Sequence, residues 1–220
     1  MGQPLTIDVV SDVVCPWCFI GKRRLDSAIE GQADIEVRYQ PYRLDPTLPS
    51  EGLDRAAYMR AKFGAAPLDD MQRKLIDLGT PVGINFRFDQ IHRSPNTLDC
   101  HRLILWAGSA GVQSEVVDDL FSRYFERGED VSNHETLIAA ASDAGLDGDQ
   151  VRDLLKSDED RDLIVSEDDR ARKMGIEGVP CFIVGGRYAL LGAQEPAILR
   201  QVFNRVREES SLLGGASARA

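Results

Sequence analysis

The sequence has no apolar run close to the roughly 20 residues that a membrane-spanning helix needs. Its N-terminal residues also lack the basic start, apolar stretch and cleavage site of a secretory signal. Basic residues are in the minority, since 26 Lys and Arg stand against 36 Asp and Glu, a formal net charge of −10. A nucleic-acid backbone requires clustered positive charge. We therefore expect a cytoplasmic protein that neither spans a membrane nor binds nucleic acid.

Cysteine is scarce, and the positions of the four cysteines limit what they can do. They are Cys15, Cys18, Cys100 and Cys181. Structural disulfides are uncommon in proteins without an export signal, and no second Cys-x-x-Cys is present to complete a four-ligand zinc site. We therefore expect no metal site. Cys100 and Cys181 are interpreted as small buried side chains rather than as an auxiliary redox pair.

Two segments with strand character enclose a helix near the start of the chain. Leu5 to Ser11 alternates and is rich in β-branched residues, which predicts a strand. A helix is predicted from Pro16 to Ile29, because proline is tolerated in the first turn and Gly31 can end the helix. Asp34 to Gln40 predicts a second strand. The order strand, helix, strand is typical of an α/β fold.

Helical patterns then follow one another to about Gly175, and no strand is predicted among them. Apolar residues recur at helical spacing over 116–125. Ser132 to Glu135 matches a capping box at the start of a further helix. This stretch is predicted to be an all-helical insertion, and its size is reasonable for a domain.

The last part of the chain returns to strand character. Pro180 to Val184 and Arg187 to Leu191 flank Gly185-Gly186, a pair typical of a two-residue hairpin turn. Glu195 to Arg207 predicts a closing helix, and the polar residues from Ser210 onwards predict a frayed tail. The two strand-bearing parts are each too small to bury a sheet face, so we expect one four-stranded sheet with helices on both faces.

The segment Cys15-Pro16-Trp17-Cys18 lies where the first predicted strand ends and the first helix begins. The N-terminus of a helix stabilises a thiolate, which is the form of cysteine that attacks a disulfide. Residues three apart on a helix are neighbours, so Cys18 can attack the mixed disulfide that Cys15 forms. Pro16 and Trp17 fix the backbone between the two cysteines and cover Cys18. The motif predicts a redox-active dithiol with Cys15 as the nucleophile.

Acidic, histidine and aromatic side chains near the motif can be explained by structural roles without a catalytic function. Asp12, three residues before Cys15, is interpreted as a solvated or capping acid rather than as a proton acceptor. His92 and His101 are interpreted as surface or core residues, although one of them could face the active-site groove. Phe19 and Phe182 could form an apolar rim with Trp17 or belong to the core.

Five segments resemble one known family in sequence and in order. They are Ser11-Asp-Val-Val-Cys-Pro-Trp-Cys-Phe-Ile-Gly-Lys22, Pro95-Asn96-Thr97-Leu98, His101-Arg102, Gly178-Val179-Pro180 and Gly192-Ala193-Gln194. They resemble the DsbA-like thiol–disulfide oxidoreductases, in particular the FrnE-type cytoplasmic branch. The resemblance extends from about Leu5 to Arg205. It departs from that branch at Cys100 and Cys181, where a small residue and an aromatic residue are expected.

The resemblance implies a thioredoxin fold, with a four-stranded mixed sheet and an inserted helical domain. The implied boundaries are 1–45 and 176–208 for the thioredoxin-like domain, 46–175 for the insertion and 209–220 for a flexible tail. It also implies a cis peptide bond before Pro180, next to the two cysteines, and a Val179 backbone that pairs with an extended substrate. The expected catalytic residues are Cys15, Cys18 and Pro180. The expected substrate-binding residues are Pro16, Trp17, Val179, Asn96 and Thr97.

The expected function is thiol–disulfide exchange with protein or small-molecule thiols and disulfides as partners. No cofactor is expected beyond the dithiol itself, with glutathione as a candidate co-substrate. The alternative is a glutathione-dependent transferase or isomerase acting on small aromatic molecules, since the kappa-class glutathione transferases and the 2-hydroxychromene-2-carboxylate isomerases share the implied fold. Those relatives usually carry serine in place of Cys15 and lack the second cysteine. A third interpretation is a binding module without catalytic activity.

Overall fold

The computed structural model describes residues 4–64 and 68–217, with no account of side chains after Leu212. The chain begins with strand β1 (Leu5–Ser11), helix α1 (Pro16–Ile29) and strand β2 (Ile35–Pro41). β1 and β2 are parallel, as a strand–helix–strand unit requires. The predicted bounds of β1 and α1 are confirmed, and β2 is shifted by one residue from its predicted range.

Four strands form one mixed sheet in the order β2-β1-β5-β6. β5 (Cys181–Val184) runs antiparallel to β1, and β6 (Tyr188–Leu191) runs antiparallel to β5. Gly185, Gly186 and Arg187 form the turn between them, which is one residue longer than predicted. The two glycines have φ values of 58° and 66°, which glycine adopts without a steric cost. Val10 lies opposite Cys181, so the end of β1 and the start of β5 share one edge of the sheet.

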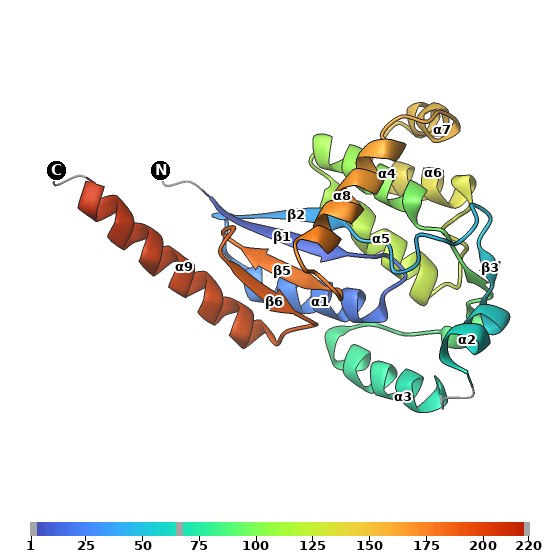
Figure 1. The fold of residues 1–220 in the computed structure, drawn as a ribbon, viewed down its shortest axis with the longest axis horizontal. Helices are drawn as coiled ribbons and strands as arrows, with labels where there is room; N and C mark the ends of the chain where they lie inside the picture. The colour runs from blue at the N-terminus through green and yellow to red at the C-terminus, as the bar shows by residue number, and fades with distance from the viewer. Residues whose placement is uncertain (1–3, 65–67, 218–220) are drawn as a thin grey trace.

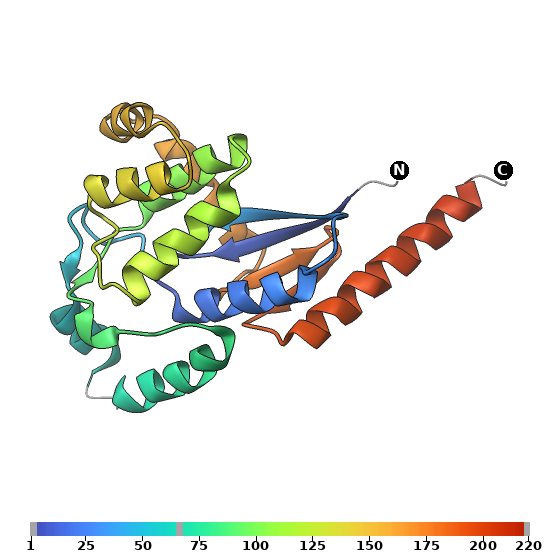
Figure 2. The same ribbon diagram turned by 180° about the vertical axis from the view of Figure 1, so that it is seen from behind.

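Helices cover both faces of this sheet, as predicted. α1 and α9 (Pro196–Ser217) lie side by side on one face, whereas α8 (Arg161–Lys173) packs on β2 from the other (Figures 1 and 2). α9 then continues past the sheet, so its end at Ser217 lies away from the helical part of the molecule (Figure 2). This four-stranded mixed sheet with helices on both faces is the thioredoxin fold that the resemblance implies.

The insertion runs from β3 to α8 and contains most of the helices. In addition to α8, its helices are α2 (Arg55–Phe63), α3 (Leu68–Gly79), α4 (Leu98–Ser109), α5 (Gln113–Phe125), α6 (His134–Asp143) and α7 (Gly148–Lys156), with short 3₁₀ turns η1 (Thr80–Val82) and η2 (Phe88–Gln90). It is not entirely helical. β3 (Leu53–Asp54) and β4 (Arg93–Ser94) form a short antiparallel pair that the sequence did not predict.

One continuous apolar core joins the insertion to the sheet. Phe19 of α1 stacks on Phe121 of α5 with ring centroids 5.0 Å apart and also contacts Phe86 and Phe125. Phe19 and Phe182 are both fully buried, so the interpretation of these two rings as core is confirmed. The helix that carries the cysteine motif is therefore held on one side by the insertion.

Two predicted helix ends are wrong. The capping residue of α6 is Asn133, whose side chain accepts a hydrogen bond from the Glu135 backbone, and not Ser132. α9 does not end at Arg207 but continues to Ser217. Glu209, which was assigned to the tail, accepts a hydrogen bond of 2.6 Å from the Tyr188 hydroxyl on β6, and this contact holds the helix beyond the predicted end.

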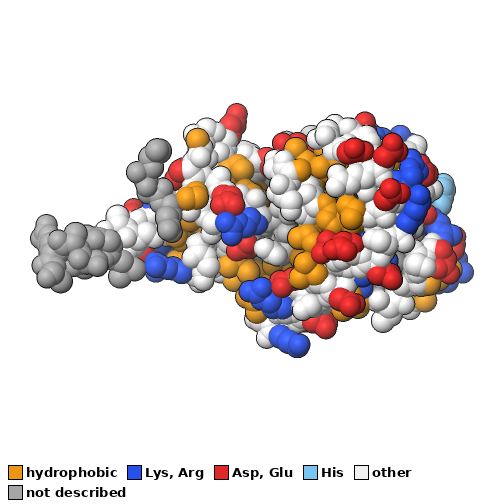
Figure 3. All heavy atoms as spheres, turned by 90° about the horizontal axis from the view of Figure 1, so that it is seen from above, with side chains coloured by type: hydrophobic (Ala, Val, Ile, Leu, Met, Phe, Trp, Pro, Cys, Tyr) orange, Lys and Arg blue, Asp and Glu red, His pale blue; other side chains and the backbone are white. Residues whose placement is uncertain are grey.

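Within the described residues, no helix is both long enough and apolar enough to cross a bilayer. On the face shown in Figure 3, Lys and Arg side chains lie among Asp and Glu rather than in a patch of their own. Several basic side chains of the described residues pair with acidic ones, such as Arg207 with Asp34 at 2.8 Å. The excess of acidic residues is therefore spread over this face together with basic ones.

Candidate active site

The two cysteines of the motif lie at the N-terminus of α1. A turn closed by a hydrogen bond from the Cys15 backbone N–H to the Asp12 carbonyl connects β1 to the helix. Cys15 is the capping residue, and its Sγ accepts a hydrogen bond of 3.3 Å from the Cys18 backbone N–H. Pro16 occupies the first turn, where a missing N–H costs nothing. The helix therefore directs a backbone donor at the Cys15 sulfur, as suits a thiolate.

Cys15 and Cys18 are both buried but differ in what surrounds them. Both are free thiols. Cys15 is 4% exposed and lines a cavity, whereas Cys18 is 2% exposed and lies behind it. Burial raises the pKa of the Cys18 thiol well above its ordinary value, and the adjacent Cys15 raises it further. Cys15 is thus the sulfur that a substrate can reach, and Cys18 is held as a protonated thiol behind it.

The segment before β5 lies directly against this site. Cys15 Sγ is 3.5 Å from the Val179 carbonyl oxygen, and the Val179–Pro180 peptide bond is cis. Gly21 of α1 fits here because a Cβ on it would lie 2.9 Å from Pro180 Cγ. The structure thus brings Cys15, Cys18, Val179 and Pro180 together, although they are separated by more than 160 positions in the sequence.

A cavity of about 320 Å³ opens beside Cys15. One wall, the cysteine wall, consists of residues 14–17 and 178–179, and therefore includes Pro16, Trp17 and Val179. The opposite wall, the insertion wall, comes from the loop after β2, from α2 and α3, and from neighbouring segments of the insertion. Its apolar residues include Leu44, Leu48, Met59, Phe63, Met71 and Leu75. A sulfur and an apolar surface thus border the same cavity.

Polar groups of the insertion wall were missed by the sequence interpretation. Arg55 at the start of α2 donates through Nη1 to the Tyr124 hydroxyl of α5 at 2.9 Å. Burial raises the pKa of Tyr124 to about 12, so this hydroxyl stays protonated at neutral pH. Tyr58 donates to Asp45 at 2.9 Å on the same wall. No local motif marks these residues, because they come from three separated segments.

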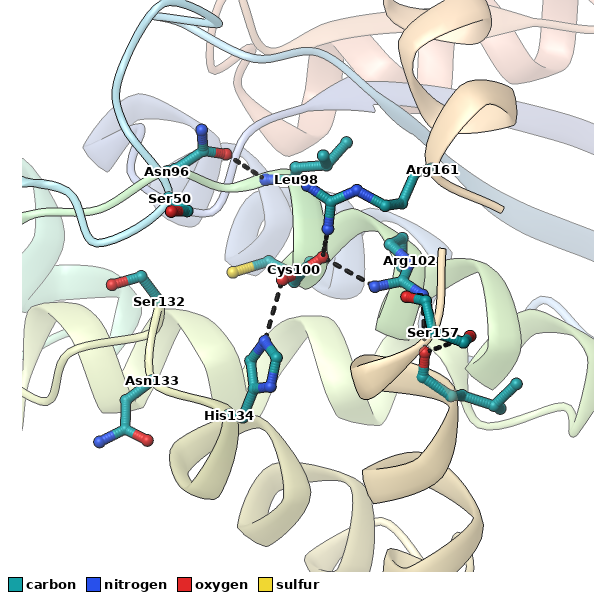
Figure 4. Close-up of polar contacts among 12 residues, drawn as sticks. Ser50, Asn96, Leu98, Cys100, Arg102, Ser132, Asn133, His134, Ser157 and Arg161 are labelled. Atoms are coloured by element: carbon teal, nitrogen blue, oxygen red, sulfur yellow. Dashed lines mark hydrogen bonds and ion pairs between the residues drawn. The ribbon is translucent and has the colours of Figure 1, made fainter. Parts of the chain in front are cut away.

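Of the predicted substrate-binding residues Asn96 and Thr97, only Thr97 lines the cavity. Thr97 is buried there. Asn96 accepts a hydrogen bond from the Leu98 backbone N–H at 3.0 Å (Figure 4) and donates one to the Leu48 carbonyl at 2.6 Å. Both ends of its amide are therefore engaged by the backbone, and Asn96 fixes the loop that carries Leu48. α4 begins directly after Thr97, whose side chain makes no capping hydrogen bond.

Asp12 is not the solvated acid that was expected. It is 1% exposed, and its Oδ2 accepts a hydrogen bond of 2.7 Å from the Leu44 backbone N–H. Its Oδ1 lies 3.5 Å from Nε2 of His101, which is 4% exposed. The expectation failed because the insertion covers the end of β1. Asp12 instead ties the start of the cysteine motif to Leu44 of the cavity and to α4.

Cys100 and Cys181 are fully buried, which confirms their interpretation as packed side chains. Cys100 lies on α4 (Figure 4) and donates to the Val131 carbonyl at 3.2 Å. Cys181 begins β5 and packs with Val10 and Ile176. Burial raises the pKa of both thiols. Among the described residues, no cluster of His, Cys, Asp and Glu forms a metal site.

Comparison with known sequences gives a family for almost the whole chain. The profile described as a DSBA-like thioredoxin domain matches residues 6–204. The chain is also 27% identical to the protein YwbO of Bacillus subtilis over 186 residues, which cover 81% of this chain and 86% of that protein.

Three solved structures share the fold. A protein named as a probable DsbA oxidoreductase from Streptomyces coelicolor has a TM-score of 0.84 and 25% identity, covering 93% of this chain and 91% of that chain. A 2-hydroxychromene-2-carboxylate isomerase has a TM-score of 0.70 and 17% identity over 94% and 98% of the chains. The cytosolic disulfide reductase DsbM of Pseudomonas aeruginosa, solved with glutathione, has a TM-score of 0.65 and 16% identity over 94% and 98%. With its fold and its family match in agreement, the chain belongs to the DSBA-like thioredoxin domain family.

Proposed function

We propose that this protein is a thiol–disulfide oxidoreductase that exchanges disulfides with its substrates through Cys15 and Cys18. The observation that carries the proposal is the asymmetry of the two sulfurs: Cys15 lines the cavity at a helix N-terminus, and Cys18 is buried behind it. The family and the oxidoreductases of the same fold support thiol chemistry in general. The proposal includes the FrnE-type branch, a cytoplasmic location, and no cofactor beyond the dithiol.

In the reductive direction, the Cys15 thiolate attacks one sulfur of a substrate disulfide. A bond forms between Cys15 and that sulfur, and the other sulfur leaves as a thiolate that takes a proton from solvent. Cys18 then loses its proton and attacks the Cys15 sulfur. The Cys15–Cys18 disulfide forms and the second substrate thiol is released. Two electrons pass from the dithiol to the substrate, and the oxidative direction is the same sequence reversed.

The residues around the sulfur position the substrate in this scheme. The Val179 backbone borders Cys15 at 3.5 Å, and main-chain pairing with an extended segment binds substrates without demanding a sequence. Pro16 and Trp17 supply apolar contact on the same wall. Pro180 packs against Gly21 of α1 and keeps this segment at the helix N-terminus. Thr97 lines the cavity further from the motif.

The test is catalysed reduction of a disulfide substrate with dithiothreitol as the electron donor. Insulin serves as the protein substrate and hydroxyethyl disulfide as the small one. The expected result is turnover well above the dithiothreitol blank, lost on Cys15→Ser and retained on Cys100→Ala. No rate above the blank with either substrate would refute the proposal and favour a binding module without catalysis.

A second candidate function is a glutathione-dependent transferase or isomerase for small aromatic molecules. The largely apolar cavity beside Cys15 favours it, because such a cavity accommodates a small molecule. A 2-hydroxychromene-2-carboxylate isomerase also has this fold. Glutathione with an aromatic electrophile distinguishes the two functions. Conjugation that survives Cys18→Ser would support the transferase, whereas disulfide exchange requires both cysteines for turnover.

A further inference from the structure

The described residues of the cavity lining carry more positive than negative charge. Three of them have charged side chains: Asp45, Arg55 and Lys62. Lys62 lies 4.0 Å from Asp45. The Asp45 carboxylate also accepts hydrogen bonds from the Tyr58 hydroxyl and from Thr47. Lys62 donates to the Tyr58 hydroxyl at 2.7 Å, and Tyr58 in turn donates to Asp45. Asp45 and Lys62 are thus linked within the wall, and Arg55 is the cation outside that link.

Arg55 has a neutral partner and no anionic one. Its only side-chain hydrogen bond among the described residues is to the Tyr124 hydroxyl, at 2.9 Å. No carboxylate of the described part of the chain lies within 4.0 Å of its guanidinium, and the residue is half-buried. Tyr124 in turn donates to the Arg93 carbonyl at 3.2 Å and so has no proton to offer a ligand. A guanidinium carries five donors in a planar fork that matches a carboxylate.

The remainder of the insertion wall around Arg55 is apolar and adaptable. Met59 and Phe63 follow Arg55 on α2, and Met71 and Leu75 face the cavity from α3. Methionine side chains are flexible and polarisable, so they can pack against ligands of different shape. Phe63 is 43% exposed and Met71 39% exposed, which leaves apolar surface for a ligand to cover.

We propose that the cavity binds a small disulfide or thiol with an apolar body and a carboxylate. The carboxylate pairs with Arg55, the apolar body packs on Met59, Met71 and Leu75, and the sulfur lies at Cys15. This inference rests on the proposed function and names its substrate class. The chemistry is unchanged: the Cys15–Cys18 dithiol becomes a disulfide, and the bound substrate disulfide becomes two thiols.

The dimensions of the site favour a small molecule over a polypeptide. A volume of about 320 Å³ lies within the roughly 300–1,000 Å³ of small-molecule pockets. α2 and α3 lie beyond the N-terminal end of α1 (Figure 1), and both contribute residues to the cavity that Cys15 lines, so the sulfur faces a chamber. An apolar side chain of a protein substrate would fill the same chamber but would bring no carboxylate to Arg55. The anionic group therefore separates the two substrate classes.

The test compares two aromatic disulfides in single turnovers of the fully reduced protein, where no other reductant is needed. Dithiobis-nitrobenzoate carries carboxylates and dithiodipyridine is neutral at pH 7, and both release coloured thiols. For each reagent, the rate constant with the protein is divided by the rate constant of the same reagent with a free peptide thiol. This ratio corrects for the different intrinsic reactivities of the two disulfides. The wild-type protein is expected to prefer the carboxylate reagent. Arg55→Gln is expected to lower that preference about tenfold, the effect of losing one charge-assisted pair.

Arg60→Gln is the matched control, because Arg60 is exposed on the same helix and does not line the cavity. It removes the same charge from the protein and is expected to leave the preference unchanged. An equal loss in both variants would mean long-range attraction rather than a binding site, and would overturn the inference. If the wild-type protein shows the same preference between the two reagents as the free peptide thiol does, the inference is also overturned, while the proposed function stands. Failure of both reagents to react at Cys15 would instead refute the proposed function.

A second measurement uses no reaction and does not depend on the folding of Arg55→Gln. Phenylpropionate and phenylpropionamide differ only in the charged group, and each is titrated into Cys15→Ser by calorimetry. The acid is expected to bind about tenfold more tightly than the amide. Equal affinities would overturn the assignment of Arg55. If insulin competes with the acid and the two aromatic disulfides show no selectivity, the chamber takes protein side chains and the small-molecule proposal fails.

Discussion

The two walls of the cavity are built in different ways. The cysteine wall comes from two short segments, residues 14–17 and 178–179, which adjacent strands of the sheet hold side by side. The insertion wall collects residues from positions 44 to 124, carried by loops and helices that meet only in the folded chain. The first wall holds the reactive sulfur, and the second holds the apolar surface and Arg55. Reactivity and selectivity are thus separable, and substitutions on the two walls should have different consequences.

The largest effect is expected on the cysteine wall, from Cys15→Ser. A serine hydroxyl does not attack a disulfide at neutral pH, so reduction of any disulfide should fall to the level of the dithiothreitol blank. Stability should change little, because serine is close to cysteine in size. The measurement is turnover of hydroxyethyl disulfide, with urea unfolding to confirm the fold. Residual activity above one tenth of the wild type would place the nucleophile elsewhere.

Asp12 joins the two walls, and Asp12→Ala should weaken that connection. The change leaves the Leu44 backbone N–H without its acceptor and removes the carboxylate oxygen that lies 3.5 Å from His101 Nε2. We expect a loss of about 2 kcal/mol in the free energy of unfolding, the usual cost of a buried unpaired donor. Asp8→Ala is the control, since Asp8 lies on the same strand and is half-buried. Equal losses in urea unfolding would show that the Asp12 contacts add nothing.

Alkaline pH should lower the free energy of unfolding through two buried thiols, Cys18 in α1 and Cys100 in α4. Burial raises the pKa of Cys18 and of Cys100, so the unfolded chain releases these protons above about pH 8.5 while the folded chain keeps them. The free energy of unfolding should therefore be constant below that pH and fall as the pH rises above it. Each thiol contributes a slope of up to about 1.4 kcal/mol per pH unit. Urea unfolding of the reduced protein measures this. Cys100→Ala should reduce the slope, and an unchanged slope in that variant would contradict the assignment.

The smallest effect on function is expected from the cysteines outside the cavity. Cys100→Ala with Cys181→Ala should cost about 1–3 kcal/mol of stability through lost packing. Turnover per folded molecule should remain that of the wild type, because neither sulfur lines the cavity. Activity is measured together with the folded fraction from circular dichroism. A loss of turnover comparable to that of Cys15→Ser would make them part of the redox chemistry.

How far the sequence predicts the molecule depends on how local each signal is. Strand alternation and the proline of α1 give the bounds of β1 and α1 without reference to the rest of the chain. The Gly185-Gly186 turn is equally local. The Cys15–Cys18 motif is recognised because its four residues are consecutive. For these elements a few neighbouring residues are sufficient.

The parts that were missed depend on contacts between distant residues. β3 and β4 have two residues each and pair Leu53 with Ser94, a contact too short to leave a periodic pattern. Asp12 looks solvated until the loop after β2 and α4 cover it. Arg55 resembles any surface cation in the sequence, and only the fold places it in the chamber with Cys15. The insertion wall therefore could not be assigned from composition or spacing.

The most direct test of the central claim is to trap the first step. Cys18→Ser keeps the nucleophile but removes the thiol that releases it. Incubation with one equivalent of an aromatic disulfide should leave one adduct per chain, and peptide mass spectrometry should place it on Cys15. Cys15→Ser should carry no adduct under the same conditions. An adduct on Cys18 in Cys15→Ser and none on Cys15 in Cys18→Ser would reverse the two roles and contradict the account.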